Sequence, residues 1–125
     1  MSHNILLLDD NELIIQMLTM ICQAEGYLTH AATNFAGAQK ILETTPIDLI
    51  VTDLNLPDIT GHDTITALRQ LPAAAATIPI IIISGQPQAT LDAIASERGA
   101  QAALSKDGGF PAIASALPVL IKSFT

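Results

Sequence analysis

The sequence predicts an α/β domain built on a five-stranded parallel sheet with helices on both faces. Short apolar runs alternate with segments whose apolar residues recur every three or four positions, and this alternation repeats five times over 125 residues. Continuous apolar runs are typical of strands buried on both faces, as parallel sheets require. Spacings of three and four place apolar side chains on one face of a helix. Alternating strands and helices imply parallel strands joined by right-handed crossovers.

Three of the five predicted strands are strongly apolar and two are mixed. The apolar runs span residues 5–8, 47–51 and 78–83, and the mixed candidates span residues 28–32 and 100–104. Mixed composition is typical of strands at the edge of a sheet. The first, third and fourth strands are therefore predicted to be central. The strand order 2-1-3-4-5 satisfies this condition and is the doubly wound, flavodoxin-like arrangement.

Apolar stripes predict five helices, one after each strand. The stripes comprise Leu13, Ile14, Met17, Leu18 and Ile21; Phe35, Ala38, Ile41 and Leu42; Ile65 and Leu68; Leu91, Ile94 and Ala95; and Ile113 and Leu117. Gly26 and Gly99 follow the first and fourth stripes, where a glycine commonly ends a helix. Pro118 is expected to end or kink the fifth helix, because proline cannot donate a backbone hydrogen bond.

Composition excludes several classes of function. The formal net charge is −7 and lysine plus arginine total five, which disfavours binding to nucleic acid or to anionic membranes. The N-terminus has no basic region typical of a signal peptide, and the apolar run 78–83 is too short to cross a bilayer. The single cysteine, Cys22, cannot form an internal disulfide and is interpreted as a packing residue. We expect one cytoplasmic domain spanning residues 1–125.

Polar residues stand at the ends of four predicted strands. The first strand ends in Asp9 and Asp10, the third in Asp53, the fourth in Ser84 and Gly85, and the fifth in Ser105 and Lys106. Because ligand sites of open α/β sheets form beyond the carboxyl ends of the strands, these residues are expected to converge at one edge.

The converging residues favour phosphoryl chemistry with a hard cation. Carboxylates held close together either raise one another's pKa or bind a cation, and oxygen ligands favour Mg²⁺. A carboxylate beside Mg²⁺ is a competent nucleophile for phosphoryl transfer. Lys106 is a point charge suited to a phosphoryl oxygen, Ser84 can donate a hydrogen bond to the same group, and Gly85 leaves room for a ligand.

One longer stretch follows the third strand: Asp53-Leu54-Asn55-Leu56-Pro57-Asp58-Ile59-Thr60-Gly61. Together with the acidic pair, the Ser84-Gly85 pair and Lys106, it resembles the receiver-domain family of response regulators in two-component signalling. The resemblance covers nearly the whole chain. No single motif decides it, but five matching residues occur in the expected order at the expected strand ends: Asp9, Asp10, Asp53, Ser84 and Lys106.

The resemblance implies a phosphorylation-dependent signalling switch. Asp53 would accept a phosphoryl group from a histidine kinase or a phosphotransfer protein in a Mg²⁺-dependent reaction. The implied Mg²⁺ ligands are Asp9, Asp10, Asp53 and the backbone carbonyl of Asn55. Ser84 would be the switch hydroxyl that moves toward the phosphoryl group, and Lys106 would bond a phosphoryl oxygen. Apart from self-phosphorylation from phosphodonors and autodephosphorylation, no enzyme activity is expected.

The resemblance also implies an output surface. The fourth helix, fifth strand and fifth helix carry little charge, and in this family that face often meets a partner. We therefore expect the phosphorylated form to alter partner binding there, with weak homodimerisation as one form of contact. The effector is expected either as a domain after Thr125 or as a separate protein. The first turn of the first helix, with Asn11 and Ile14, is a candidate docking site for the phosphodonor.

The chain departs from the family pattern at two positions. Ala103 stands three residues before the lysine, where the family usually has an aromatic side chain that rotates inward on activation. Asp107 follows the lysine where proline is common, so a trans peptide bond is expected. The next residues, Gly108 and Gly109, are expected to make the loop before the fifth helix more mobile. In this family, two positions that flank the phosphoryl group adjust its lifetime, and here they are occupied by Asn55 and Gln86. Both side chains can orient a water molecule, which suggests moderate autodephosphorylation.

Local structural interpretations remain open for four of these residues. Asp10 could cap the first helix, and Asp53 could be a turn residue ahead of Pro57. Ser84 could cap the helix near Pro87, and Lys106 could be a solvated surface lysine. The joint pattern favours the functional interpretation of all four.

Three other functions are alternatives to the switch. A pseudo-receiver, which keeps the fold but switches poorly, is favoured by Ala103 and opposed by the acidic pair together with Asp53 and Lys106. A phosphatase of the haloacid dehalogenase type needs an acid where Asn55 stands and a nucleophile after the first strand. Dinucleotide binding needs a Gly-x-Gly-x-x-Gly motif after the first strand, and none is present.

Overall fold

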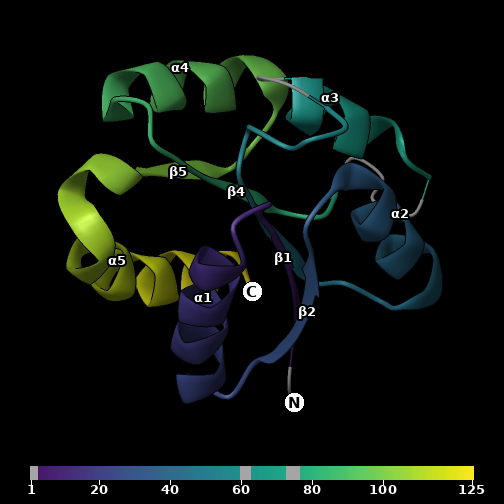
Figure 1. Cartoon of the computed structure of the whole chain (residues 1–125), viewed down its shortest axis with the longest axis horizontal. Helices are drawn as coiled ribbons and strands as arrows, with labels where there is room; N and C mark the ends of the chain where they lie inside the picture. Colours follow the sequence, from purple (N-terminus) through teal and green to yellow (C-terminus); the bar gives the residue numbers. More distant parts are fainter. Residues whose placement is uncertain (1–2, 60–62, 73–76) are drawn as a thin grey trace.

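Strands and helices alternate along the chain as the sequence predicts (Figure 1). The structure is a computed structural model that describes residues 3–59, 63–72 and 77–125. The strands are β1 (Asn4–Leu8), β2 (Leu28–Ala32), β3 (Leu49–Thr52), β4 (Ile80–Ser84) and β5 (Ala102–Ser105). The helices are α1 (Glu12–Ala24), α2 (Phe35–Thr44), α3 (Asp63–Gln70), α4 (Gln88–Arg98) and α5 (Gly109–Phe124), with one 3₁₀ turn, Lys106–Gly108, directly before α5.

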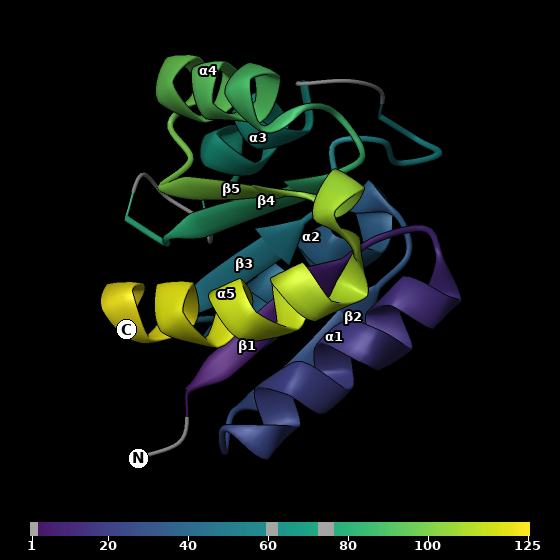
Figure 2. The same ribbon diagram turned by 90° about the vertical axis from the view of Figure 1, so that its left-hand side faces the viewer.

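The five strands form one parallel sheet in the order β2-β1-β3-β4-β5, which confirms the predicted topology. β1 is central, because Leu6 lies opposite His30 of β2 on one side and Ile50 of β3 on the other. Figure 2 shows α1 and α5 side by side on one face of the sheet. The apolar faces of α2, α3 and α4 pack on the opposite face.

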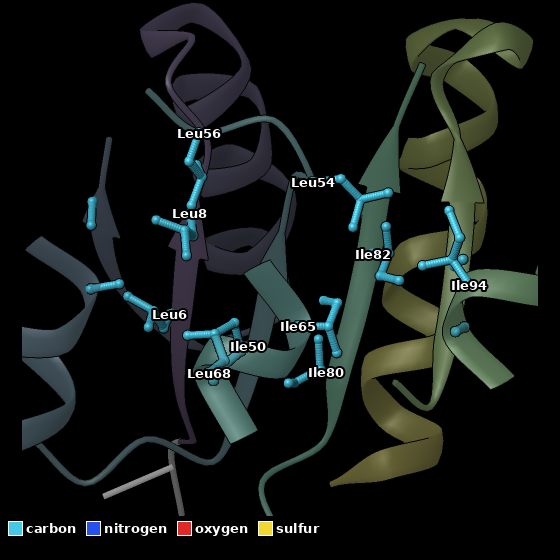
Figure 3. Packing of buried hydrophobic residues seen from close by; sticks show 14 of the residues in the cluster. Leu6, Leu8, Ile50, Leu54, Leu56, Ile65, Leu68, Ile80, Ile82 and Ile94 are labelled. Atoms are coloured by element: carbon cyan, nitrogen blue, oxygen red, sulfur yellow. The ribbon is translucent and has the colours of Figure 1, made fainter. Parts of the chain in front are cut away.

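The core consists of two layers, one on each face of the sheet. Alternate strand residues point to opposite faces, so neighbouring residues of β1 and β4 contribute to different layers. The layer under α2, α3 and α4 is shown in Figure 3 and includes Leu6, Leu8, Ile50, Ile80, Ile82, Ile65, Leu68 and Ile94. The layer under α1 and α5 includes Ile5, Leu7, Val51, Ile81, Ile83, Leu18, Cys22, Ile113, Leu117 and Ile121. Burial of each large aliphatic side chain stabilises the fold by about 1.5–3 kcal/mol.

Both predicted glycine helix ends are confirmed. Gly26 and Gly99 adopt φ values of +86° and +88°, which side chains with a Cβ rarely adopt. After α1, the backbone N–H of Tyr27 donates to the carbonyl of Cys22 at 3.1 Å. This reversed hydrogen bond turns the chain from the helix into the next strand.

The helices differ from the sequence-based expectations at two places, and a kink at Pro118 stays a prediction. α5 does not end at Pro118 but continues to Phe124. Ile113, Leu117 and Ile121 are buried along one side of α5, and their packing outweighs the hydrogen bond that Pro118 cannot donate. Leu13 was expected in the buried stripe of α1, but its side chain is 62% exposed.

Among the described residues, no helix has both the length and the apolar composition needed to cross a bilayer.

The single thiol is predicted to be unreactive in the folded protein. Cys22 is fully buried in the layer under α1 and α5, and this burial raises the pKa of its thiol from 9.0 to about 11. The shift lowers the thiolate fraction at neutral pH about a hundredfold, and the thiolate is the reactive form. We expect a disulfide reagent to label Cys22 only after unfolding in urea. Rapid stoichiometric labelling of the native protein would show that α1 opens readily.

Candidate functional site

Two buried aspartates lie side by side where β1 and β3 end. The strands are paired, with Leu8 opposite Thr52, so the residues that follow them, Asp9 and Asp53, leave the sheet together. The backbone N–H of Asp53 donates to the carbonyl of Leu8 at 2.9 Å and fixes this end of the pairing. Asp10 is exposed beside them. Carboxylate oxygens of the three aspartates all lie within 4.8 Å of one another.

Lys106 joins the two buried aspartates. Its Nζ lies 3.1 Å from Oδ2 of Asp9 and 3.0 Å from Oδ2 of Asp53. Burial alone would lower the pKa of Lys106, but the charges and hydrogen bonds of Asp53 and Asp9 outweigh it and raise that pKa. The side chain is only 25% exposed, so Lys106 is not a solvated surface lysine.

One positive charge does not compensate two buried carboxylates. Burial raises the pKa of Asp9 above its ordinary value. The backbone N–H of Asn11, which donates to Oδ1 of Asp9 at 2.9 Å, and the charge of Lys106 oppose this rise, while the charge of Asp53 adds to it. The site therefore favours a further cation, and its all-oxygen donor set fits a hard divalent ion.

The turn after β3 fixes one oxygen of Asp53. Oδ1 accepts hydrogen bonds from the backbone N–H groups of Leu54 at 2.6 Å and Asn55 at 3.2 Å. The carbonyl of Leu54 accepts from the buried hydroxyl of Thr64 at 3.1 Å, and the side chains of Leu54 and Leu56 are buried in the core (Figure 3). Asp53 is thus both a turn residue and a member of the site, and its Oδ2 faces Lys106.

Asp58 braces the same turn against α2, a contact that the sequence did not reveal. Its carboxylate accepts from the backbone N–H groups of Phe35 at 2.8 Å and Ala36 at 3.0 Å. Asp58 is 23 residues from Phe35 along the chain, so no local motif signals the pairing. The hydrogen bond from Phe35, with a further contribution from Ala36, lowers the pKa of Asp58, because a helix N-terminus favours the charged carboxylate.

Asp58→Asn is expected to weaken the fold at neutral pH and to have little effect in acid. Because the folded protein lowers the pKa of Asp58, its stabilisation is complete above the ordinary value of 3.8 and is lost as the pH falls through the lower folded value. Urea midpoints of wild type and variant should therefore differ at pH 7 and converge below pH 3.8. A difference that persists unchanged in acid would contradict this role. Glu97→Gln, at an exposed position of α4, is the control.

The hydroxyl of Ser84 is unusual because it is buried without a partner. Ser84 is the last residue of β4 and is fully inaccessible, and within the described ranges its Oγ has no hydrogen-bond partner. It does not cap α4, whose N-cap is Pro87. A buried hydroxyl with no partner is costly, and such groups are rare in folded proteins. At Gly85 an added Cβ would meet no described atom within 4 Å, so this side of the site is open.

Asp10 does not cap α1, so the alternative interpretation of Asp10 as a helix cap is wrong. The cap is Asn11, whose Oδ1 accepts from the backbone N–H groups of Leu13 at 2.9 Å and Ile14 at 3.4 Å. Asp10 thus stays beside the other two aspartates. Asn55 is exposed between two buried leucines, and a metal contact by its backbone carbonyl stays a prediction. Thr60 and Gly61 lie outside the described residues.

The two departures from the family pattern are visible in the structure. Ala103 is buried on the face of β5 that packs under α4, so the position is filled by a methyl group. The peptide bond between Lys106 and Asp107 is trans, as expected. No free loop separates Lys106 from α5, because the glycine segment forms the 3₁₀ turn that runs into this helix.

Comparison with known proteins places these features in one family. Residues 5–118 match the response regulator receiver domain. The chain is 30% identical over 106 residues to TorR of Escherichia coli O157:H7, a transcriptional regulatory protein of the TorCAD operon. That alignment covers 85% of the chain and 44% of TorR. A response regulator structure from Chloroflexus aurantiacus has a TM-score of 0.86 and 25% identity, with 99% and 98% of the two chains covered.

A second solved structure carries the ion that the donor set favours. It is the receiver domain of a sensor histidine kinase from Pseudomonas aeruginosa, with a magnesium ion coordinated in its active site cleft. Its TM-score is 0.81 at 18% identity, and the alignment covers 99% of this chain and 98% of that one, so it is similar in fold.

The chain spans about half the length of the curated relatives it matches. Its fold, strand order and family match agree with one another over nearly all of its length. The chain belongs to the response regulator receiver domain family.

Proposed function

We propose that residues 1–125 act as one phosphorylation switch in which Asp53 accepts a phosphoryl group from a histidine kinase or phosphotransfer protein. One observation carries the proposal. Asp53 is buried against Lys106 and Asp9 with its Oδ1 held by two backbone N–H groups, at the open end of a parallel sheet. A structural scaffold does not need two buried carboxylates that share one lysine, because burying ions costs free energy.

The geometry favours Oδ2 of Asp53 as the nucleophile. Oδ1 is already held by the backbone N–H groups of Leu54 and Asn55, whereas Oδ2 accepts only from the Nζ of Lys106 among the contacts described. Oδ2 attacks phosphorus, and the bond from phosphorus to the donor nitrogen breaks. The donor imidazole keeps the electron pair and takes a proton from solvent. Hydrolysis later returns the free carboxylate when water attacks the same phosphorus.

Asp9, Asp10, Asp53 and the backbone carbonyl of Asn55 would hold Mg²⁺. The three carboxylates have oxygens close enough to share one ion. The pKa of Asp9 is raised mainly by its burial, with a smaller contribution from the charge of Asp53. Bound Mg²⁺ would neutralise the charge that develops on the transferred phosphoryl group. The magnesium-bearing relative of similar fold supports this assignment.

Ser84 and Lys106 are proposed to convert the chemistry into a conformational change. The unpartnered hydroxyl of Ser84 gains an acceptor when it turns toward a phosphoryl oxygen. Lys106 exchanges its contacts with Asp53 for a contact with the same group. Both new hydrogen bonds exist only in the phosphorylated protein, and only such differential contacts shift a conformational equilibrium.

The output is proposed to be a change of binding at the α4–β5–α5 face, meaning the surface formed by α4, β5 and α5. Phe110 and Val119 of α5 are exposed apolar side chains, and Val119 is 65% exposed. On the other side of the site, the first turn of α1 is proposed to dock the phosphodonor. There Leu13 is the exposed apolar side chain, whereas Ile14 packs against the core.

Self-phosphorylation by a small phosphodonor tests the proposal. The protein is incubated with acetyl phosphate in Mg²⁺ or in a chelator and weighed intact. We expect the mass of one phosphoryl group to appear with Mg²⁺ and to be lost with the chelator. Equal phosphorylation with Mg²⁺ and with the chelator would contradict the assignment of Mg²⁺. Absence of labelling in both samples would indicate a pseudo-receiver, the alternative that Ala103 favours.

A further inference from the structure

The carboxamide of Gln88 ties the first turn of α4 to the backbone of β5. Its Nε2 donates to the carbonyl of Ala103 at 2.8 Å, and its Oε1 accepts from the backbone N–H of Ser105 at 3.0 Å. One side chain thus holds β5 on both sides of Leu104. Nε2 also donates to Oδ1 of Asp92 at 2.9 Å, one turn further along α4, which fixes the orientation of the carboxamide.

A second contact ties the same two segments together. The hydroxyl of Ser105 donates to the backbone carbonyl of Gln86 at 2.7 Å and accepts from the backbone N–H of Asp107 at 3.1 Å. Three hydrogen bonds therefore link the segment 86–88 to the end of β5. We call this set the Gln88 latch: Gln88 to Ala103, Gln88 to Ser105, and Ser105 to Gln86.

The latch is bounded at both ends by residues of the proposed phosphorylation site. Ser84, whose hydroxyl lacks a partner, begins the segment that leads to Gln88 four residues later. Lys106, which bonds Asp9 and Asp53, directly follows Ser105. A shift of either residue toward a phosphoryl group on Asp53 is transmitted along a short backbone to one half of the latch. Hydrogen bonds weaken steeply when the donor and acceptor move apart or lose alignment.

The latch also forms part of an outward-facing groove of about 380 Å³. The groove lies between the start of α4, the end of β5 and the first turns of α5. Its lining residues include Gln88, Ser105, Leu104, Ile113 and Ala116. Opening the latch would change the wall of this groove.

We propose that the Gln88 latch is the conformational device that reports the state of Asp53 to the α4–β5–α5 face. The latch is closed in the unphosphorylated protein and opens when Ser84 and Lys106 engage the phosphoryl group. This inference rests on the proposed function. In the family, an aromatic side chain at the position of Ala103 usually changes rotamer on activation, and an alanine methyl has no rotamer to change. The inference assigns this reporting role to the side-chain amide of Gln88 on α4.

The test uses nuclear magnetic resonance with beryllofluoride, a stable phosphoryl analogue, in the presence of Mg²⁺. We expect the analogue to shift the backbone amides of Leu54 and Asn55 at the site, and also the side-chain amide of Gln88 and the backbone amide of Ser105. Gln88→Met keeps the length of the side chain and removes its hydrogen bonds. In this variant the free protein should show β5 amides displaced toward their activated positions.

The same variant should bind beryllofluoride about three- to tenfold more tightly, the range expected when one or two net hydrogen bonds no longer hold the inactive state. Ser105→Ala, which removes the bond to Gln86, should act in the same direction and provides a second variant. Gln16→Met, at an exposed position of α1, is the matched control and should behave as wild type.

The outcomes separate the two proposals. If wild type shows no shift at Leu54 and Asn55, the proposed function fails and the latch fails with it. If those amides shift while the signals of Gln88 and Ser105 stay in place, the switch exists but the latch is overturned. Unchanged beryllofluoride affinity in both latch variants would also overturn it.

Discussion

Asp53→Asn is expected to abolish phosphoryl uptake while leaving the fold intact. The asparagine amide oxygen can still accept from the backbone N–H groups of Leu54 and Asn55, which hold Oδ1 in wild type. Its nitrogen replaces the oxygen that faces Lys106, and an amide is not a nucleophile for phosphorus. Lys106 keeps its partner Asp9. Incubation with acetyl phosphate and Mg²⁺ should therefore give no mass gain, at a urea midpoint equal to or above that of wild type.

The matched control for this substitution is Asp107→Asn. Asp107 is exposed and directly follows Lys106, so its replacement changes the charge of the chain by the same amount near the same place. The control should be phosphorylated like wild type. If Asp53→Asn were phosphorylated to the level of this control, another residue would be the acceptor and the assignment of Asp53 would be refuted.

Lys106→Met is expected to cause the largest loss of stability among these variants when Mg²⁺ is absent. The substitution leaves Asp9 and Asp53 buried without the cation that lies 3.1 and 3.0 Å from them. Removing one partner of a buried ion pair typically costs about 3–5 kcal/mol of folding free energy. Because Lys106 is partly exposed, we expect a loss of about 3 kcal/mol. Urea unfolding at pH 7 with a chelator measures this loss. Saturating Mg²⁺ should restore part of it, because ligands that bind only the folded state stabilise it.

Two comparisons make the Lys106 result interpretable. Lys122→Met, at an exposed position of α5, should leave the urea midpoint almost unchanged. The double variant Lys106→Met with Asp53→Asn should be more stable than Lys106→Met alone, because one uncompensated carboxylate has been removed. Equal stability of Lys106→Met and wild type in the chelator would show that the lysine does not compensate the site.

The fold could be predicted from the sequence because its signals are local and repeated. β1, β3 and β4 are continuous aliphatic runs, and period-two alternation then divides Ile5, Leu6, Leu7 and Leu8 between the two core layers. Helix ends were predicted where backbone conformation demands glycine, as at Gly26. The helix that continues through Pro118 was not predicted, since burial of Leu117 and Ile121 is a tertiary effect.

From the sequence, only those residues of the site that lie at or directly after the end of a strand could be predicted. Asp9, Asp53 and Lys106 meet because parallel strands deliver their last residues to one edge. The supporting contacts were missed because they join distant segments through exposed polar side chains. Asp58 reaches the N-terminus of α2, and Gln88 reaches the backbone of β5. Aspartate after proline and glutamine near a helix start are ordinary in sequence, so neither residue type signals its partner.

Chemical trapping of the phosphorylated residue tests the central claim most directly. The protein is phosphorylated with acetyl phosphate and Mg²⁺ and then treated with borohydride, which reduces an acyl phosphate to an alcohol and so converts a phosphorylated aspartate to homoserine. Peptide mass spectrometry then locates the converted residue. The account predicts homoserine at position 53 and unmodified aspartate at positions 9 and 10. Conversion at Asp9 or Asp10, or a phosphoryl group that resists borohydride, would contradict it.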